Sequence, residues 1–318
     1  MRDFVRALSL STLAALSLSA QETPTPNRVA WMAIFPEPLP NGAPRIALEF
    51  TSQFLRPTSE RSADGRTFAR LDGEEWQITG DLSRQLGLGQ LNLRLRMVDR
   101  SGGIADSYIQ NWHRALGIPN GGRDSVPNGR LTYHLERDGV VIAELTKSGL
   151  HLMDSDLSYI LSFVNQQAGA RIGASVQLPT GNQGDFSGSG GWEGLVGASG
   201  WIGSGKWRLH GQLEHIFIGL PEHSPYRAVL GRRAFSRGWI GGGWQGNGPG
   251  FWRGFGLDVT FAYNTSPYRV GIPRIDDPGL QQHWVLTHKA LPNWRFGLSE
   301  EAGSYSVPDA TLFVSRRF

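Results

Sequence analysis

Residues 206–218, KWRLHGQLEHIFI, alternate between apolar and polar side chains. The apolar side chains share one parity: Trp207, Leu209, Leu213 and Phe217. The polar side chains share the other: Lys206, Arg208, His210, Gln212 and Glu214. Because successive side chains of a β-strand point to opposite faces, this segment predicts a strand with one apolar face and one charged face.

The same two-residue period recurs along most of the chain. It is clear in residues 91–97, 131–136, 170–177 and 254–264. It is noisier in residues 45–55, 74–86, 140–147, 157–165, 192–203, 238–246, 281–290, 294–300 and 309–318. Short turns, among them 87–89 and 137–139, alternate with longer connections. The pattern predicts an all-β fold, a single transmembrane antiparallel β-barrel of about 14 strands with 12 as the alternative, with lipid outside and water inside.

Composition agrees with a membrane barrel and excludes several other classes. A group of tryptophans lies near strand ends, as the aromatic girdles of such barrels require: Trp76, Trp192, Trp207, Trp284 and Trp294. The alternative, a soluble sandwich or propeller, would bury its apolar face, and no repeat of fixed period supports a propeller. The net charge of +3 is too small to indicate nucleic acid as a partner, and Cys 0 excludes thiolate metal sites. We expect no metal and no cofactor.

The N-terminus has the pattern of an export signal. Arg2 and Arg6 precede an apolar run at 7–16 and small residues at 17–20, which predicts cleavage near Ala20, with an uncleaved amphipathic segment as the alternative. The expected organisation is a signal peptide at 1–20, a Pro-rich periplasmic extension at 21–44 and the barrel at 45–318. No later stretch approaches the roughly 18 apolar residues of a membrane-spanning helix.

One segment departs from the two-residue period. In residues 101–124, SGGIADSYIQNWHRALGIPNGGRD, the apolar residues Ile104, Tyr108, Trp112 and Leu116 recur every four positions. This spacing predicts an amphipathic helix of about thirteen residues in an extracellular loop, ending at Gly117 before Pro119. Such a helix must pack on the barrel mouth, enter the lumen or lie on the lipid interface. We expect it to enter the lumen and constrict it.

The pattern SGGxxDxxIxxWHxxLGxPxGGR in this segment resembles a family of uncharacterised bacterial outer-membrane β-barrel proteins, as does the preceding GEEWQITGDLSRQLGLGQLNLRLRM. The resemblance implies an outer-membrane location and no established activity. Its motif positions carry over without assigned roles: Gly102, Gly103, Asp106, His113, Gly117 and Arg123. The C-terminal Phe318 resembles the aromatic signal that the outer-membrane assembly machinery recognises, which makes this machinery and membrane lipids the expected partners.

Catalysis has weak support in the sequence. Asp106, Ser107 and His113 are the residue types of a hydrolytic triad, but Ser107 and His113 are six residues apart on a helix and therefore lie on different faces. The acidic pairs Asp154/Asp156 and Asp276/Asp277 fall in external loops, where we expect them to be solvated. We therefore expect no enzyme, with a lipid-modifying hydrolase as the minority alternative.

The parity of the strands also predicts which side chains line the lumen. They form a mixed field with an excess of arginine: Arg94, Arg96, Arg130, His134, Glu136, Arg171, Lys206, Arg208, His210, Glu214 and Asp258. Arginines in a pore favour anionic solutes, so the sequence indicates a passive or gated pore for a small polar or anionic solute. An equal alternative is that these charges pair and brace a non-conducting structural barrel.

Overall fold

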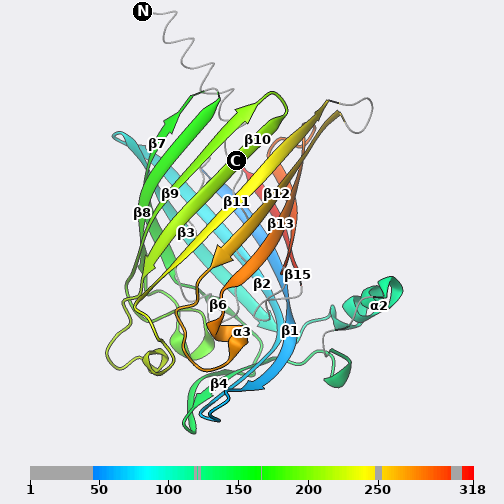
Figure 1. Ribbon diagram of the computed structural model, residues 1–318, viewed down its shortest axis with the longest axis vertical. Helices are drawn as coiled ribbons and strands as arrows, with labels where there is room; N and C mark the ends of the chain where they lie inside the picture. Colours follow the sequence, from blue (N-terminus) through cyan, green and yellow to red (C-terminus); the bar gives the residue numbers. More distant parts are fainter. Residues whose placement is uncertain (1–45, 118–119, 121–122, 166, 248–252, 302–309) are drawn as a thin grey trace, which may run out of the picture.

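The computed structural model of the chain describes residues 46–117, 120, 123–165, 167–247, 253–301 and 310–318. The expected signal peptide at 1–20 and extension at 21–44 lie outside the described residues. Twelve antiparallel strands close into a barrel (Figure 1). They are β1 (Ile46–Arg61), β2 (Thr67–Leu86), β3 (Gly89–Ser101), β7 (Ser155–Val164), β8 (Ala168–Leu178), β9 (Glu193–Ser204), β10 (Trp207–Phe217), β11 (Ala234–Asn247), β12 (Arg253–Asn264), β13 (Gly279–His288), β14 (Trp294–Glu301) and β15 (Ala310–Arg317). Each strand pairs with the next barrel strand along the chain, which for β3 is β7, and the last strand, β15, pairs with β1.

Three further described strands lie outside this ring: β4 (Thr132–Arg137), β5 (Val140–Leu145) and β6 (Gly149–Leu152). Strand β2 pairs with β3 along residues 74–86 and with β4 along residues 67–72. The β4–β5 hairpin therefore continues the sheet past the rim of the barrel. This explains why the ring has twelve strands, the alternative number, because the count of about fourteen had included segments 131–136 and 140–147.

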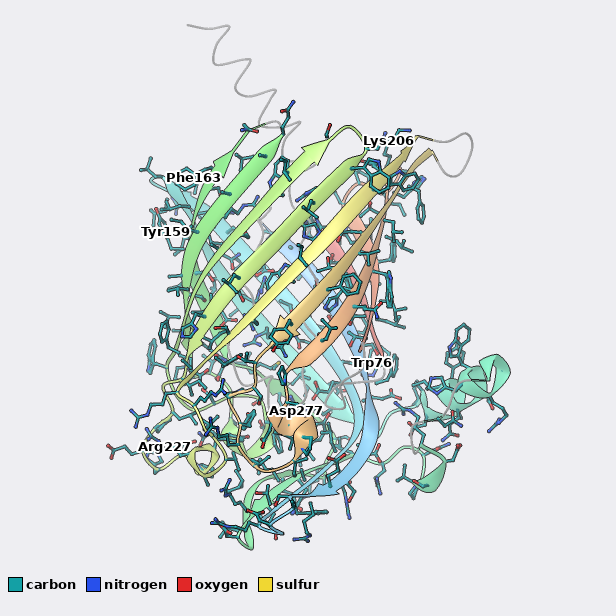
Figure 2. The ribbon with its side chains drawn as sticks, viewed as in Figure 1. Trp76, Tyr159, Phe163, Lys206, Arg227 and Asp277 are labelled. Atoms are coloured by element: carbon teal, nitrogen blue, oxygen red, sulfur yellow. The ribbon has the colours of Figure 1, made fainter. Side chains whose placement is uncertain are left out.

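The two ends of the barrel differ. One end, here called the turn end, carries tight turns such as the one at Gly87 and the one that contains Lys206 (Figure 2). Ile46 and Phe318 also meet there, since the Phe318 amide donates to the Ile46 carbonyl at 2.9 Å. The opposite end, the loop end, carries the long connections. The short turn at 137–139 does not lie at the turn end with the other short turns. It lies at the loop end, where the Asp138 amide donates to the Arg66 carbonyl.

The outer and inner faces of the wall follow the two-residue period. On β10, Leu209, Leu213 and Phe217 are exposed, whereas His210 and Glu214 are buried. An exposed apolar outer face is stable only against lipid, and the buried polar face lines the interior. The predicted fold class is therefore confirmed. Among the described residues, no helix is both long and apolar enough to cross a membrane.

The short helices are not part of the barrel wall. They are α2 (Asp106–Leu116), the 3-10 turns η1 (Arg123–Ser125), η2 (Gln183–Asp185) and η3 (Pro225–Ala228), and α3 (Pro273–Asp276). The helix predicted in residues 101–124 is present as α2, but it projects outward beside β1, beyond the barrel wall (Figure 1). The expectation that it enters and constricts the lumen is therefore corrected.

Candidate functional site

The signature motif anchors α2 to the outer rim. Asp106 accepts hydrogen bonds from the Arg123 Nη1 and the Gly129 amide, both at 2.8 Å, and Arg123 is buried. The Ala105 amide donates to Glu74 Oε1 of β2 at 2.7 Å. These bonds hold the start of the helix at the rim and explain why the helix points away from the lumen.

The remaining motif positions also have structural places. Gly102 and Gly103 pass close to the Gly129 backbone and the Glu74 side chain, and Gly117 ends α2 in the left-handed conformation with φ of 69°. His113 is half-buried on α2, while Ser107 is exposed. The motif therefore anchors the loop to the rim. Its Asp106 forms an ion pair with Arg123 and does not orient a histidine.

The inner wall carries matched ion pairs between neighbouring strands. Arg94 of β3 contacts Asp81 of β2 at 2.7 Å, and Arg237 of β11 contacts Glu214 of β10 at 2.5 Å. In both pairs the residues are directly opposite in the strand register. His210 of β10 contacts Asp258 of β12 at 2.9 Å. Arginines and carboxylates thus meet across neighbouring strands and stabilise one another where both side chains are buried.

Further arginines cluster inside the turn end. They lie near the turn-end termini of their strands and have the inward parity: Arg171 on β8, Arg208 on β10, Arg295 on β14 and Arg317 on β15. Arg208 lies within electrostatic range of both Arg171 and Arg317. Arg208 is also within electrostatic range of the Asp258 carboxylate. The four arginines place positive charge at this end of the lumen.

The predicted lumen residues fall into two groups. On the inward face of the ring are Arg94, Arg96, Arg171, Arg208, His210, Glu214 and Asp258. Three others, Arg130, His134 and Glu136, lie in or just before β4, outside the ring, where Arg130 pairs with Asp72 at 2.6 Å and His134 with Glu144 at 2.9 Å. These three do not belong to the barrel wall, because β4 pairs with the extension of β2 beyond the rim. Lys206 lies in the turn before β10 (Figure 2).

A packed apolar body lies at the loop end of the barrel. We call it the cap, and it consists of residues 131–145, 179–192, 218–233 and 265–278. Its centre is aromatic: the Phe186 ring lies 5.7 Å from Tyr133 and 6.5 Å from Tyr226, and all three side chains are fully buried. The cap packs on inward apolar side chains of the wall, namely Leu195, Ile216 and Phe235. α3 and Asp277, which directly follows it, lie at this end of the barrel (Figures 1 and 2).

Arg100 joins the cap to the wall. Its Nε donates to Glu75 Oε1 at 2.7 Å, and its Nη1 donates to the Asp185 carbonyl at 2.6 Å. Tyr133 donates its hydroxyl to the same Glu75 oxygen at 2.9 Å. Arg100 is fully buried, so one guanidinium links a wall strand, the β4–β5 hairpin and the η2 loop.

Asp154 makes a second connection between the cap and the wall. Its carboxylate accepts the Gly181 amide at 2.7 Å and the Ser189 amide at 2.8 Å, so it closes the η2 loop around itself. Its carbonyl accepts a bond from Arg96 at 2.7 Å. Burial raises the pKa of this carboxyl above its usual range. The expectation that Asp154 is solvated was therefore wrong, because the loop folds back onto it.

The sequence contained a weak signal for the cap. Ile216 and Phe235 are apolar although they stand on the inward, polar parity of β10 and β11. Arg100 has the same parity on β3 as Arg94 and Arg96, so the same reasoning places it on the inward face. The partners Glu75 and Asp81 could not be chosen without the register between β2 and β3.

Comparisons with known proteins agree with this fold. Residues 62–217 match a family model described as "Protein of unknown function (DUF3187)", which covers just under half of the chain. The outer membrane channel COG4313 from Pseudomonas putida F1 is similar in structure, with a TM-score of 0.51 and 12% identity over 88% of this chain and 97% of that chain. At this identity the likeness shows the fold alone.

Two other solved structures are similar at lower scores. The NanC porin has a TM-score of 0.42 and 7% identity, over 85% of this chain and 98% of that chain. The outer membrane channel DcaP of Acinetobacter baumannii has a TM-score of 0.32 and 9% identity, over 86% of this chain and 95% of that chain. No curated protein sequence matches the chain.

Proposed function

We propose that this chain is an outer-membrane pore for a small anionic or polar solute, and that the cap, not helix α2, restricts its loop-end mouth. The observation that carries the anionic preference is the arginine cluster inside the turn end, where Arg208 lies within range of Arg171 and Arg317. Fixed positive charges along a passage lower the energy of an anion there and raise that of a cation.

The orientation follows from the two ends of the barrel. Barrels of this class have short turns on the periplasmic side and long loops outside. The turn end, where Ile46 meets Phe318, then faces the periplasm, and the cap faces the exterior. Phe318 follows β15 and is exposed, and the Arg316 guanidinium lies over its ring, 4.6 Å from the ring centroid. In this orientation Phe318 is available to the assembly machinery from the periplasmic side.

The test is ion selectivity in planar bilayers. With a KCl gradient across the membrane, we expect a reversal potential that indicates chloride preference. The double variant R208Q/R317Q should shift the reversal potential toward zero or toward potassium. The variant R84Q changes an exposed arginine at the turn end of β2 and serves as the control. A cation preference in the unmodified protein would contradict the proposed solute class.

A second candidate, a non-conducting structural barrel, is favoured by one observation. The inward charges that pair directly, such as Arg94–Asp81 and Arg237–Glu214, neutralise each other and brace the wall. A protein that stays silent in bilayers even after the cap is loosened would favour this role. Hydrolysis of lipid has no comparable support, since Asp106 forms an ion pair with Arg123. If His113→Ala leaves the lipid composition of the membrane unchanged, the hydrolase alternative is excluded.

A further inference from the structure

A pocket opens at the loop end, between the segment that follows β10 and the segment that precedes β11. Its volume is about 470 Å³. Its lining includes the apolar residues Ile218, Leu220 and Leu230 and the arginines Arg227, Arg232 and Arg233. Figure 2 shows Arg227 on the outer side of the loop end, away from the barrel axis. The pocket is therefore on the flank of the molecule, outside the lumen.

The arginines of this pocket are available to an anion. Arg232 and Arg233 are exposed, and within the described part of the chain their guanidinium groups make no hydrogen bond or ion pair. Arg227 is held in place because its Nε donates to the Pro221 carbonyl and its Nη2 to the Leu220 carbonyl, both at 2.6 Å. Against these three cations, segment 219–233 has one acidic residue, Glu222. The arginines therefore outnumber the acidic residues of this segment.

The pocket also adjoins the lipid-facing surface. Phe217 and Trp192 are exposed on the outward parity at the loop ends of β10 and β9. Gly219, which lines the pocket, passes so close to the Trp192 carbonyl that a Cβ there would collide with it. Exposed aromatics at strand ends mark the boundary between acyl chains and headgroups. The pocket therefore begins where the lipid headgroups lie.

We propose that this pocket binds the phosphate of an outer-leaflet lipid headgroup, with the acyl chains of that lipid lying against Phe217 and Trp192. The planar guanidinium forms paired, charge-assisted hydrogen bonds with phosphate oxygens. A free anion would use the arginines but not the adjoining apolar surface, whereas a phospholipid uses both. The proposal goes beyond pore function, because the pocket lies outside the lumen.

The experiment measures lipid retention by native mass spectrometry of the full-length protein, refolded without lipid in detergent. The probes are bisphosphorylated lipid A, dephosphorylated lipid A and inorganic phosphate. The variant R232Q/R233Q is compared with R114Q, which changes an exposed arginine on α2. A heat-modifiability gel confirms that each variant is folded. Since each arginine adds a charge-assisted bond to the phosphate, we expect about tenfold weaker binding of bisphosphorylated lipid A per substitution.

The outcomes separate the sources of the ligand. The proposal holds if R114Q binds lipid A like the unmodified protein, while the double variant and the dephosphorylated lipid both bind weakly. It is overturned if R232Q/R233Q retains full affinity, or if dephosphorylated lipid A binds as tightly as the phosphorylated form. It is also overturned if inorganic phosphate at equal concentration displaces the lipid, because the pocket would then recognise a free anion.

Discussion

His210 and Asp258 bond to each other across an intervening strand. His210 is on β10 and Asp258 on β12, and the two strands are separated by β11, yet His210 Nε2 lies 2.9 Å from Asp258 Oδ2. The inward position of β11 between them is Gly241, whose register partners are His210 on β10 and Thr260 on β12. Because Gly241 has no side chain, the imidazole and the carboxylate can meet over its backbone. Thr260 completes the group with a bond to Asp258 at 3.0 Å.

Gly241→Ala tests this arrangement. A Cβ at this position would collide with the His210 ring and the Thr260 hydroxyl, so we expect the bond to break at a cost of about 1–3 kcal/mol. Urea unfolding of the protein in lipid vesicles measures the loss. Gly242→Ala is the matched control, because Gly242 faces outward and a Cβ there makes only an ordinary contact with the Arg208 carbonyl. Equal effects of the two substitutions would show that the bond adds nothing to stability.

Arg100→Met tests the attachment of the cap. The substitution leaves the buried Glu75 carboxylate without its cation and frees the η2 loop, at an expected cost of about 3–5 kcal/mol. Limited proteolysis should then cleave in residues 179–192 faster than in the unmodified protein. Arg66→Met removes the exposed Arg66–Asp138 pair, which solvent screens, and should leave the rate of cleavage unchanged. If both variants resist the protease equally, Arg100 does not hold the cap.

The barrel wall could be predicted because its signal is local. A two-residue period separates the apolar side of a strand from its polar side, and it does so without knowledge of the neighbouring strand. Residues 131–136 show the limit of this reasoning. Their alternation is as clear as that of the wall, but Tyr133 and Leu135 are buried in the cap and not exposed to lipid. Periodicity identifies a strand with two faces and cannot name what covers each face.

The place of α2 depended on long-range bonds. The four-residue spacing predicted the helix and its end at Gly117. The direction of the helix is set by hydrogen bonds that Asp106 accepts from Arg123 and Gly129, and by the hydrogen bond that the Ala105 amide donates to Glu74. These partners are up to about thirty residues away along the chain. Glu74 had been counted only as part of a strand, so the sequence held no reason to turn the helix outward.

Alkaline pH should open the cap. Burial raises the pKa of both Tyr226 and Tyr268 above the ordinary tyrosine value, so the folded cap favours their neutral forms. Because the folded-state pKa exceeds the unfolded value of about 10, this stabilisation is complete below pH 10 and declines as the pH rises further.

Absorbance at 295 nm during alkaline titration follows the ionisation. We expect a late, cooperative phase that Tyr226→Phe diminishes and that coincides with faster proteolysis of the cap. Tyr108→Phe, on the exposed face of α2, should reduce only the early phase. A smooth titration with no late phase would mean that the two tyrosines are accessible to water in the folded protein.

Replacing residues 107–116 by a Gly-Ser linker should leave conductance unchanged. The replacement removes most of α2 but keeps Asp106, and with it the ion pair to the buried Arg123. Since α2 projects outside the barrel, its loss does not alter the passage (Figure 1). Phe186→Gly, in contrast, removes the aromatic centre of the cap at a residue whose φ of 59° glycine adopts readily, and should increase conductance in planar bilayers. A rise in conductance with the linker and none with Phe186→Gly would place the helix, not the cap, in the path of the solute.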